Sequence, residues 1–525
     1  MKKKLISIIS LILVMVLLIT SCSEKVPTST NNDEQSSEIN TESEKQDQAK
    51  RTDIVLGSIG EPKTLDPTQV SDLVAYYVTH QIYDNLIYYG TDQTLTPGLA
   101  ESWTYSDDGT EVTFNLKQGV KFHNGDVMTA DDVVFSLNNA IASAFTQGVT
   151  AVMEKAEKID DNTVLLKLKH SYGPIEYCIA SSQIIIVNKK AYEADPEGYG
   201  RNPIGTGPYK FVEWKAGDKI ILEAFEDYYK GPAEIKDVTF KVITDGSTAV
   251  IALENGEIDI IDTPPKTDRQ NLIDNPDIEY YETEIAATVF ITINHKSELG
   301  SNKKFREAIA HAIDKESMVI GAVEGVGTPI HTPMVKSAFG WPEDFKNREY
   351  DVEKAKQLLA EAGFPNGLDI ELKTTESATY FKPTEVLQDQ LKKIGINASI
   401  SKMERGAFWD DIMTARDYDI AVSAVTATYP DSDHIYSMFH GSMVEKGKNY
   451  FNYSNPELDD LLDRGRLSND QEERKQIYRE VCELFKEDVV SIPLYTYMTP
   501  IAANKNLKGV MAHPTNRMFV YDYSW

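Results

Sequence analysis

Apolar and polar residues alternate along several short stretches of the chain, as they do in strands with one buried face. The alternation is seen in TVLLKLKH (residues 163–170) and in TFNLKQGVKFH (residues 113–123). The apolar run IVLGSIG (residues 54–60) also indicates a strand, with turns expected at Pro62 and Pro67. Strands are therefore expected along much of the chain.

Other stretches place apolar residues three to five positions apart, which is typical of a helix with one buried face. In KKFREAIAHAIDKESMV (residues 303–319) these residues are Phe305, Ile309, Ile313 and Met318. Strand and helix patterns are mixed along the whole length, without a repeat of fixed period. We therefore predict an α/β protein with more than one lobe.

A second helix is predicted in SNDQEERKQIYREVCELFKED, residues 468–488. Asn469 is expected to cap its N-terminus, and Glu472, three residues later, resembles the second member of a capping box. The stripe expected to be buried consists of Ile477, Val481, Leu484 and Phe485.

A long apolar run lies at the N-terminus. The basic segment MKKK is followed by fifteen mainly apolar residues (5–19), and the small residues Thr20 and Ser21 then precede Cys22. This pattern predicts a signal peptide over residues 1–21, because the run is too short for a typical transmembrane helix. Its ending resembles the signal of bacterial lipoproteins, in which Cys22 becomes the lipidated mature N-terminus. The alternative is a plain signal peptide with an incidental cysteine.

The segment after Cys22 is strongly polar. Residues 23–50 contain no aromatic residue and almost no bulky apolar one, so they cannot bury enough surface to order themselves. We interpret residues 22–50 as a lipidated cysteine followed by a disordered tether. The lipid would hold the folded body at the extracytoplasmic face of the cell membrane without spanning it.

Length and charge narrow the function further. A chain of 525 residues fits two or three domains. A net charge of −29 argues against a nucleic-acid partner and favours neutral or cationic ligands over anionic ones, unless the charge is simply solvated surface. Cys178 and Cys482 could pair in an exported protein, although two buried free thiols are the interpretation we favour.

The sequence carries none of the familiar catalytic motifs. It contains nine histidines but no HExxH pair, no GxSxG elbow, no Walker A pattern and no strand-linked GxGxxG. Cysteine and histidine spacings suitable for zinc are also missing. We therefore predict a protein that is not an enzyme, uses no cofactor and has no dedicated metal site.

Several motifs resemble the family 5 extracellular solute-binding proteins of bacterial ABC importers, which include dipeptide-, oligopeptide- and nickel-binding proteins. The segment LTPGLAESWTYSDDGTEVTFNLKQGVKFHNGDVMTADDVVFSL (residues 95–137) resembles the family signature closely. It is followed, in family order, by NPIGTGPYKF, AIDKE, YDVEKAKQLLAEAGFPNG and YSNPELDDLLDRGR. The resemblance covers nearly all of residues 53–525.

The resemblance implies an α/β, two-lobed fold like that of the periplasmic binding proteins, of class II type, with an additional domain and a hinged cleft. Ligand favours the closed state by contacting both lobes. The expected parts are the signal peptide (1–21), the tether (22–50), a lobe I core (51–95, 205–287 and 492–525), the additional domain of lobe I (96–204) and lobe II (288–491). The implied partners are an ABC permease, its ATPase subunits and the membrane; the protein is expected to be a monomer.

The resemblance also implies which segments approach the ligand. They follow LDPTQV near residue 71, surround Phe145, span residues 404–440, and include SIPLYTYMTP near the C-terminus. The candidate ligand-binding residues are Ser71, Asp72, Leu73, Phe145, Trp409, Thr428, Tyr429, Asp431, His434, Tyr495 and Tyr497.

One segment departs from the pattern of the peptide-binding relatives. They often carry Trp-x-x-Asp where this chain has residues 425–428, and the aspartate pairs with the α-amine of the peptide. Thr428 stands at the aspartate position and carries no charge, so Asp431 or Asp433 would have to replace it. His434 could contact a nickel chelate or make an ordinary hydrogen bond.

The sequence thus predicts a lipid-anchored importer component that captures peptides. The alternative within the family is a receptor for a nickel or other metal chelate, or for an oligosaccharide, against which Trp409, Tyr76 and Tyr429 could stack. Outside transport, a surface hydrolase and a receptor that signals peptide levels remain alternatives.

Overall fold

The computed structural model of the protein describes residues 50–90 and 94–525. The expected signal peptide, Cys22 and the tether up to residue 49 lie outside the described residues. Within the described part, none of the helices combines the length and the apolar character needed to cross a membrane.

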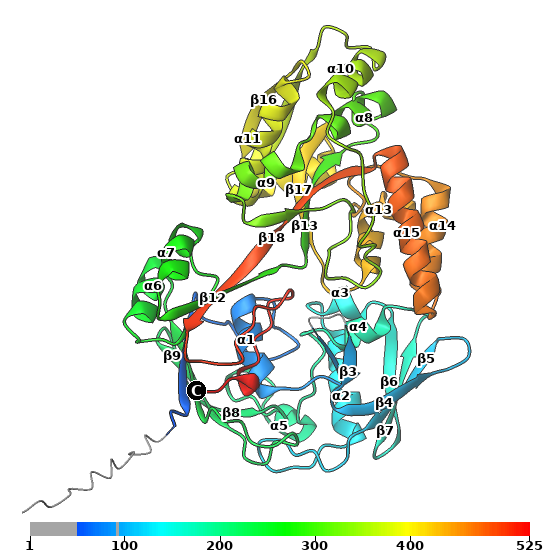
Figure 1. The fold of residues 1–525 in the computed structure, drawn as a ribbon. Coiled ribbons are helices and arrows are strands. Elements are labelled where there is room, and N and C mark those ends of the chain that lie inside the picture. The colour runs from blue at the N-terminus through cyan, green and yellow to red at the C-terminus, as the bar shows by residue number, and fades with distance from the viewer. Residues whose placement is uncertain (1–49, 91–93) are drawn as a thin grey trace, which may run out of the picture. The chain divides into compact units, whose positions relative to one another are not determined.

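One large mixed sheet runs through the described part of the chain, where it has twelve strands (Figure 1). Across the sheet the order is β16 (Ile396–Met403), β15 (Leu368–Thr375), β17 (Ile420–Thr426), β13 (Ala287–Ile293), β18 (Ser491–Asn504), β11 (Ile260–Asp262), β1 (Asp53–Ser58), β10 (Asp237–Val242), β9 (Lys219–Ala224) and β8 (Tyr209–Lys215). Beside this path, β12 (Ile278–Glu284) and β14 (Gly327–Pro329) also pair with β18.

Strand β18 connects two groups of strands. Its first residues, Ser491–Tyr495, pair with β13, whereas Met498–Asn504 pair with β12. We call β1 and β8–β12, with their helices, lobe I, and β13–β17, with their helices, lobe II. Figure 1 shows β18 passing from one group to the other. The exact lobe boundaries remain a prediction.

A second, antiparallel sheet has its own hydrophobic core. Its order is β4 (Ala100–Tyr105), β5 (Glu111–Leu116), β7 (Thr163–Leu168) and β6 (Met153–Asp160), and it packs against α2 (Ala130–Ala142). We call residues 96–204 the additional domain. The short helices α3 (Gln147–Thr150) and α4 (Ile175–Ile179) belong to this domain, and the strand pair β2 (Ile87–Tyr89) and β3 (Leu95–Pro97) leads into it.

Helices cover both groups of strands. In lobe I and the additional domain these are α1 (Leu73–Ile82), α5 (Lys189–Ala194), α6 (Gly246–Glu254) and α7 (Arg269–Asp274). In lobe II they are α8 (Lys303–Ala312), α9 (Lys315–Val323), α10 (Val352–Glu361), α11 (Ala378–Lys392), α12 (Arg405–Asp410), α13 (Tyr436–Phe439), α14 (Pro456–Leu467) and α15 (Gln471–Asp488). Single turns are η1 (Tyr199–Arg201), η2 (Lys266–Asp268), the π-helical η3 (Asp411–Ala415), η4 (Ser432–Ile435), η5 (Gly441–Met443) and η6 (Val520–Asp522).

The central residues of the predicted strands do form strands. The run beginning at Ile54 forms β1, and residues 163–168 form β7. The alternation at residues 113–123 is only partly a strand, because β5 ends at Leu116 and the chain turns at Gly119, whose φ is +74°. Apolar alternation beyond Leu116 thus continues into a turn that glycine makes accessible.

The helix predicted over residues 303–319 is two helices. Ile313 leaves the helical region (φ −91°, ψ 111°), and the Asp314 carboxylate accepts a 3.2 Å hydrogen bond from the Ser317 backbone N–H to begin α9. An aspartate followed by a free amide three positions later favours a new N-terminus over continuation. Helical spacing alone does not reveal such a break, because both helices bury the same kind of residue.

The second predicted helix forms, but with another cap. Asp470, not Asn469, accepts the backbone N–H groups of Glu472 and Glu473 at 2.9 and 3.0 Å. Asn469 instead lies 3.4 Å from the Ser171 hydroxyl in the additional domain, to which its amide donates. Of the expected stripe, Ile477, Val481 and Phe485 are buried, and Leu484 is half-buried.

The two cysteines in the described part of the chain are free and buried, as favoured from the sequence. Close packing explains the glycines of the GTGPY motif. A Cβ on Gly205 would lie 1.9 Å from the Ile82 carbonyl oxygen, and one on Gly207 would lie 2.6 Å from the Gln81 carbonyl oxygen. Only glycine lets this segment approach the end of α1 so closely.

Candidate ligand-binding cleft

Two neighbouring pockets share Thr426 and Thr428 as a common wall. The first, which we call the Arg517 pocket, has a volume of about 210 Å³. It is lined by Tyr76, Tyr89 and residues 181–183, 285–286, 426–428, 430 and 514–517. The pocket therefore collects side chains from lobe I, from the additional domain and from the end of β17.

The second pocket, which we call the His434 pocket, has a volume of about 650 Å³. One wall comes from the additional domain, around α3 and Tyr172; the other comes from lobe II, between Val425 and Arg466. A Cβ on Gly148 would lie 3.2 Å from Thr428 Cγ2, so the two walls are in contact beside the shared threonines. The two pockets form one continuous candidate cleft.

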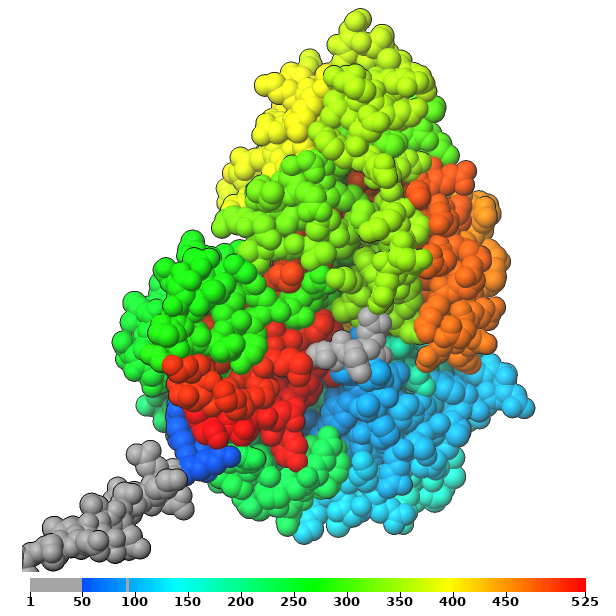
Figure 2. All heavy atoms as spheres, viewed as in Figure 1, coloured from blue at the N-terminus to red at the C-terminus, as the bar shows by residue number. Residues whose placement is uncertain are grey.

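Arg517 is the charged group of the smaller pocket. The residue is only 5% exposed, and its guanidinium donates a hydrogen bond to the Ala180 carbonyl at the end of α4. Its Nε has no hydrogen-bond partner among the described residues, and the guanidinium has no carboxylate partner there. Burial lowers the pKa of Arg517 to about 10, because the charged form is poorly solvated. Figure 2 shows the C-terminal segment, in red, at the surface beside the green segments of lobe I.

A carboxylate with three donor side chains forms the floor of the His434 pocket. Asp433 accepts hydrogen bonds from the hydroxyls of Tyr172 and Tyr429 at 2.8 and 2.7 Å, and Arg466 donates two bonds of 2.9 Å. Burial alone would raise the pKa of Asp433, but Arg466 and the hydroxyls outweigh burial and hold it below its usual range. The negative charge of Asp433 is therefore already compensated by Arg466 and the two hydroxyls.

Asp431 is also engaged by the protein. It is fully buried, and Arg474 donates hydrogen bonds to both of its carboxylate oxygens, at 2.9 and 2.7 Å. Asp431 and Asp433 were the two residues that could replace the missing amine anchor at Thr428. Each has an arginine partner, so neither offers a free carboxylate to a ligand amine.

His434 presents a neutral imidazole to the larger pocket. Its Nδ1 lies 2.7 Å from the Asp431 carbonyl oxygen, while Nε2 has no partner among the described residues. Burial lowers the pKa of His434 to about 4. In the described part of the chain, no three His, Cys, Asp or Glu residues come close enough together to hold a metal ion.

The cleft gathers some of the predicted site residues and not others. Thr428, Tyr429 and His434 line it. Asp72 caps α1 by accepting the Ala75 N–H at 2.9 Å, and Phe145 is 54% exposed, with its carbonyl accepting from the Gln183 side chain. Those that line neither pocket are Ser71, Asp72, Leu73, Phe145, Trp409, Asp431, Tyr495 and Tyr497.

The remaining aromatic candidates pack against other side chains of the protein. Tyr495 is 1% exposed in the core of lobe II, and Tyr497 is half-buried against that core. Trp409, in α12, packs against Phe408 of the same helix and Tyr380 of α11. Whether any of them meets a ligand remains a prediction.

Sequence reasoning missed Arg517, Tyr172 and Ser181. Arg517 stands in HPTNRMF, which has no recognisable motif. Only the fold reveals that its side chain is buried without a carboxylate. Tyr172 lies 261 positions from its partner Asp433, a pairing that no local pattern can indicate.

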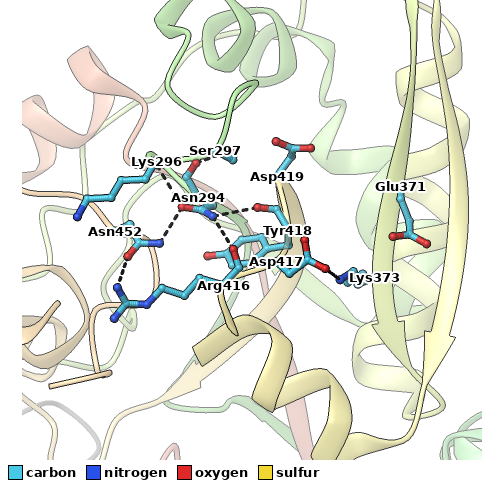
Figure 3. A pocket seen from close by; sticks show the side chains of 10 residues that line it. All are labelled: Asn294, Lys296, Ser297, Glu371, Lys373, Arg416, Asp417, Tyr418, Asp419 and Asn452. Atoms are coloured by element: carbon cyan, nitrogen blue, oxygen red, sulfur yellow. Dashed lines mark hydrogen bonds and ion pairs between the residues drawn. The ribbon is translucent and has the colours of Figure 1, made fainter. Parts of the chain in front are cut away.

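A third hollow, of about 440 Å³, lies in lobe II away from the cleft (Figure 3). Two of its basic groups have partners: Lys373 binds Asp417 at 2.8 Å, and Arg416 donates to the Asn452 side chain at 2.5 Å. Glu371, Asp417 and Asp419 also line this hollow, whereas among the described residues no Asp or Glu lines the Arg517 pocket.

Comparison with known proteins gives consistent matches. Residues 94–445 match the family described as bacterial extracellular solute-binding proteins, family 5, middle. The chain is 32% identical over 501 residues to the oligopeptide-binding protein AppA of Bacillus subtilis (strain 168), covering 90% of this chain and 91% of AppA.

Solved structures agree. HbpA2 from Haemophilus parasuis superposes with a TM-score of 0.83 at 27% identity, covering 90% of this chain and 99% of HbpA2. Bacillus subtilis AppA in complex with a nonapeptide gives a TM-score of 0.68 at 30% identity, covering 90% and 99% of the two chains.

Proposed function

The chain belongs to the bacterial extracellular solute-binding proteins of family 5, and on this basis we propose that it captures peptides in the cleft formed by the Arg517 and His434 pockets. The captured peptide would then be passed to an ABC permease whose ATPase subunits drive import. The family places the protein outside the cytoplasm. A lipid on Cys22 would keep it near that permease.

The observation that carries the proposal is the composite cleft. Its walls come from lobe I, the additional domain and lobe II, and the exposed residues Thr426 and Thr428 join its two pockets. A solute lying across the threonines would contact all three parts and would favour the arrangement in which they are close. The similarity to a protein named for oligopeptide binding favours peptide cargo.

Strand β18 is the best candidate for the flexible connection. Between its pairing with β13 and with β12 it contributes Thr496 and Tyr497, which pair with β14, and the neighbouring connection from β12 to β13 is Ile285 and Ala286. Short extended connections of this kind can absorb a hinge motion through a few backbone angles.

Calorimetric titration of the purified protein with a pool of tri- to nonapeptides tests the proposal. Saturable binding with no change in the peptides, checked by mass spectrometry, is the expected result. Cleaved peptides would support the hydrolase alternative, and the absence of binding would remove peptides as cargo. Loss of peptide uptake on gene deletion would favour import over signalling alone.

A second candidate is a metal chelate. The observation favouring it is the buried His434 Nε2, which lacks a partner among the described residues and belongs to a residue that lines the larger pocket. Neutral imidazole is a good ligand for nickel and similar metals. Titration with nickel in the presence and absence of free histidine would detect such binding, and a His434→Ala variant would abolish it.

A further inference from the structure

We propose that the Arg517 pocket is the subsite for an anionic group of the solute, and that the cargo therefore carries a carboxylate. The inference rests on the proposed capture of a solute in the cleft, and it adds the chemical group that the cleft selects. It also runs against the net charge of −29, which on its own favours cationic or neutral ligands.

The first support is an uncompensated buried cation. A guanidinium taken out of water is costly unless a counter-ion and hydrogen-bond acceptors replace the water. Arg517 is 5% exposed, yet no Asp or Glu lines its pocket among the described residues. The half-buried Arg466 of the cleft and the buried Arg474 beside it each bind an aspartate.

The titratable groups around Arg517 supply no negative charge either. Burial, together with the charge of Arg517, lowers the pKa of His80 well below its usual value and that of His513 to about 3. Both imidazoles are therefore neutral at physiological pH. Tyr88 and Tyr89 are the other titratable neighbours, and phenols are uncharged there as well. Among these groups, Arg517 is thus the one that carries a charge.

The second support is a set of unused polar atoms. Arg517 Nε and the buried Ser181 Oγ both lack hydrogen-bond partners among residues 50–90 and 94–525, and both residues line the pocket. A carboxylate has two oxygens that accept several bonds, and it therefore supplies the acceptors that both donors lack. A ligand ammonium would face repulsion from the guanidinium and could not use its N–H.

The size of the pockets gives the orientation of the solute. About 210 Å³ at Arg517 accommodates a carboxylate and a few further atoms, whereas about 650 Å³ lies beyond Thr426 and Thr428. The anionic end therefore lies at Arg517. The rest of the solute extends towards the wall formed by Val149, Val425 and Met443.

A purely structural role is the competing explanation. Arg517 donates to the Ala180 carbonyl, which ends α4, and this bond alone would explain a loss of stability on substitution. It would not explain a preference for ligands by their charge. The decisive measurement is therefore a ratio of affinities, in which a general loss of stability cancels.

The test uses two pools of tri- to pentapeptides built only from Ala, Val, Thr and Tyr. One pool has free C-terminal carboxylates, and the other is identical but C-terminally amidated. Calorimetry with the wild-type protein should show at least about 30-fold tighter binding of the free-acid pool, because removing one member of a buried charge pair is costly. Arg517→Gln should reduce this ratio to about threefold or less, and Arg517→Lys should retain an intermediate preference.

A matched control is Lys236→Gln, which removes an exposed cation paired with Glu226 outside the cleft and should keep the wild-type ratio. Circular dichroism and the unfolding midpoint establish that each variant is folded. If Arg517→Gln does not fold, the comparison is made with Arg517→Lys, whose ratio must fall below that of the wild type.

The outcomes separate the two proposals. Equal binding of both pools by the wild-type protein overturns the anionic subsite and leaves peptide capture standing, as does an unchanged ratio in the folded Arg517 variants. If neither pool binds, peptide cargo is overturned, and the solute that co-purifies from the native host decides the subsite. An acidic solute identified by mass spectrometry then supports it, and a neutral or cationic one overturns it.

Discussion

The hydroxyl of Tyr172, in the additional domain, donates a 2.8 Å hydrogen bond to the carboxylate of Asp433 in lobe II. Tyr429 donates to the same oxygen at 2.7 Å, and the two hydroxyls lie 2.9 Å apart. A backbone hydrogen bond joins the same two parts of the protein, because the Gly173 N–H donates to the Arg466 carbonyl at 2.8 Å. One buried carboxylate therefore joins two parts of the cleft wall.

We predict that Tyr172→Phe destabilises the protein by about 1–3 kcal/mol, because Asp433 loses a donor without access to water. Tyr429→Phe should have a similar effect, and the double variant should be non-additive, since both hydroxyls serve one oxygen. Urea unfolding measures each value. Tyr521→Phe, which loses an exposed bond to the Lys230 carbonyl, is the control and should change stability by about 0.5 kcal/mol or less. Equal losses in Tyr172→Phe and Tyr521→Phe would contradict the assigned role of Asp433.

The Arg474–Asp431 pair allows a second test. Both side chains are buried, at 1% and 0% exposure, so Arg474→Ala leaves a buried carboxylate without its partner. The expected loss is about 3–5 kcal/mol. Lys475→Ala, in the adjacent and exposed pair with Glu472, should cost less than about 0.5 kcal/mol. Similar unfolding midpoints for the two variants would show that the buried pair is unimportant.

Asp262 predicts a dependence of stability on pH. Burial raises the pKa of Asp262 from its ordinary value of 3.8 to about 7 in the folded protein. The folded state therefore binds the proton more tightly, and this residue makes the protein less stable as pH rises from about 4 to 7, by up to about 1.4 kcal/mol per pH unit. Asp262→Asn should remove that contribution, so its stability relative to the wild type should increase over this range and level off above it.

Denaturation of both proteins at pH 4, 5, 6, 7 and 8 measures the difference. Asp389→Asn, which changes an exposed carboxylate of α11, is the matched control, and its difference from the wild type should stay flat. A flat difference for Asp262→Asn as well would mean that its carboxylate ionises normally in the folded state.

Filling the junction of the two pockets should block binding. Thr428 is exposed and lines both, so Thr428→Trp places a bulky ring in the passage with little effect on the core. We expect peptide affinity to fall at least tenfold while the unfolding midpoint stays within a few degrees of the wild type. Val212→Trp, at an exposed position of β8, should bind normally. Undiminished binding by Thr428→Trp would place the ligand elsewhere.

The N-terminal cysteine is testable without any structure. Expression in the native host should yield a mature chain beginning at Cys22 with added acyl mass, found in the membrane fraction. Cys22→Ser should lose both the added mass and the membrane association. A wild-type chain without the added mass would instead indicate a plain signal peptide.

The sequence predicted the fold more fully than the site, for reasons visible in single residues. Alternation identified β7, and the apolar run beginning at Ile54 identified β1. Thr428, Tyr429 and His434 were found because they are close together in one segment. Arg517 was missed, because whether a buried arginine has a carboxylate depends on contacts between distant segments.

The same limit explains the misplaced details. A periodic pattern does not distinguish one helix from two that share a buried side, so the break at Asp314 was not seen. Two adjacent polar residues could each cap α15. Asp470 is the N-cap, while the Asn469 side chain donates a hydrogen bond to the additional domain. Burial of Asp431 with Arg474 likewise depends on α15 packing beside η4, which no local pattern encodes.

Because β18 pairs with both groups of strands, its length sets the register of one group relative to the other. Successive side chains of a strand point to opposite faces, so the two residues between its β13 and β12 registers fix how the faces of one lobe are phased against those of the other. Inserting a single residue there would turn every following side chain of β18 over, exchanging those that face its helices with those that face away. Inserting two would restore the phase but would still disrupt the pairing of Thr496 and Tyr497 with β14, so the length of this segment is constrained as well as its phase.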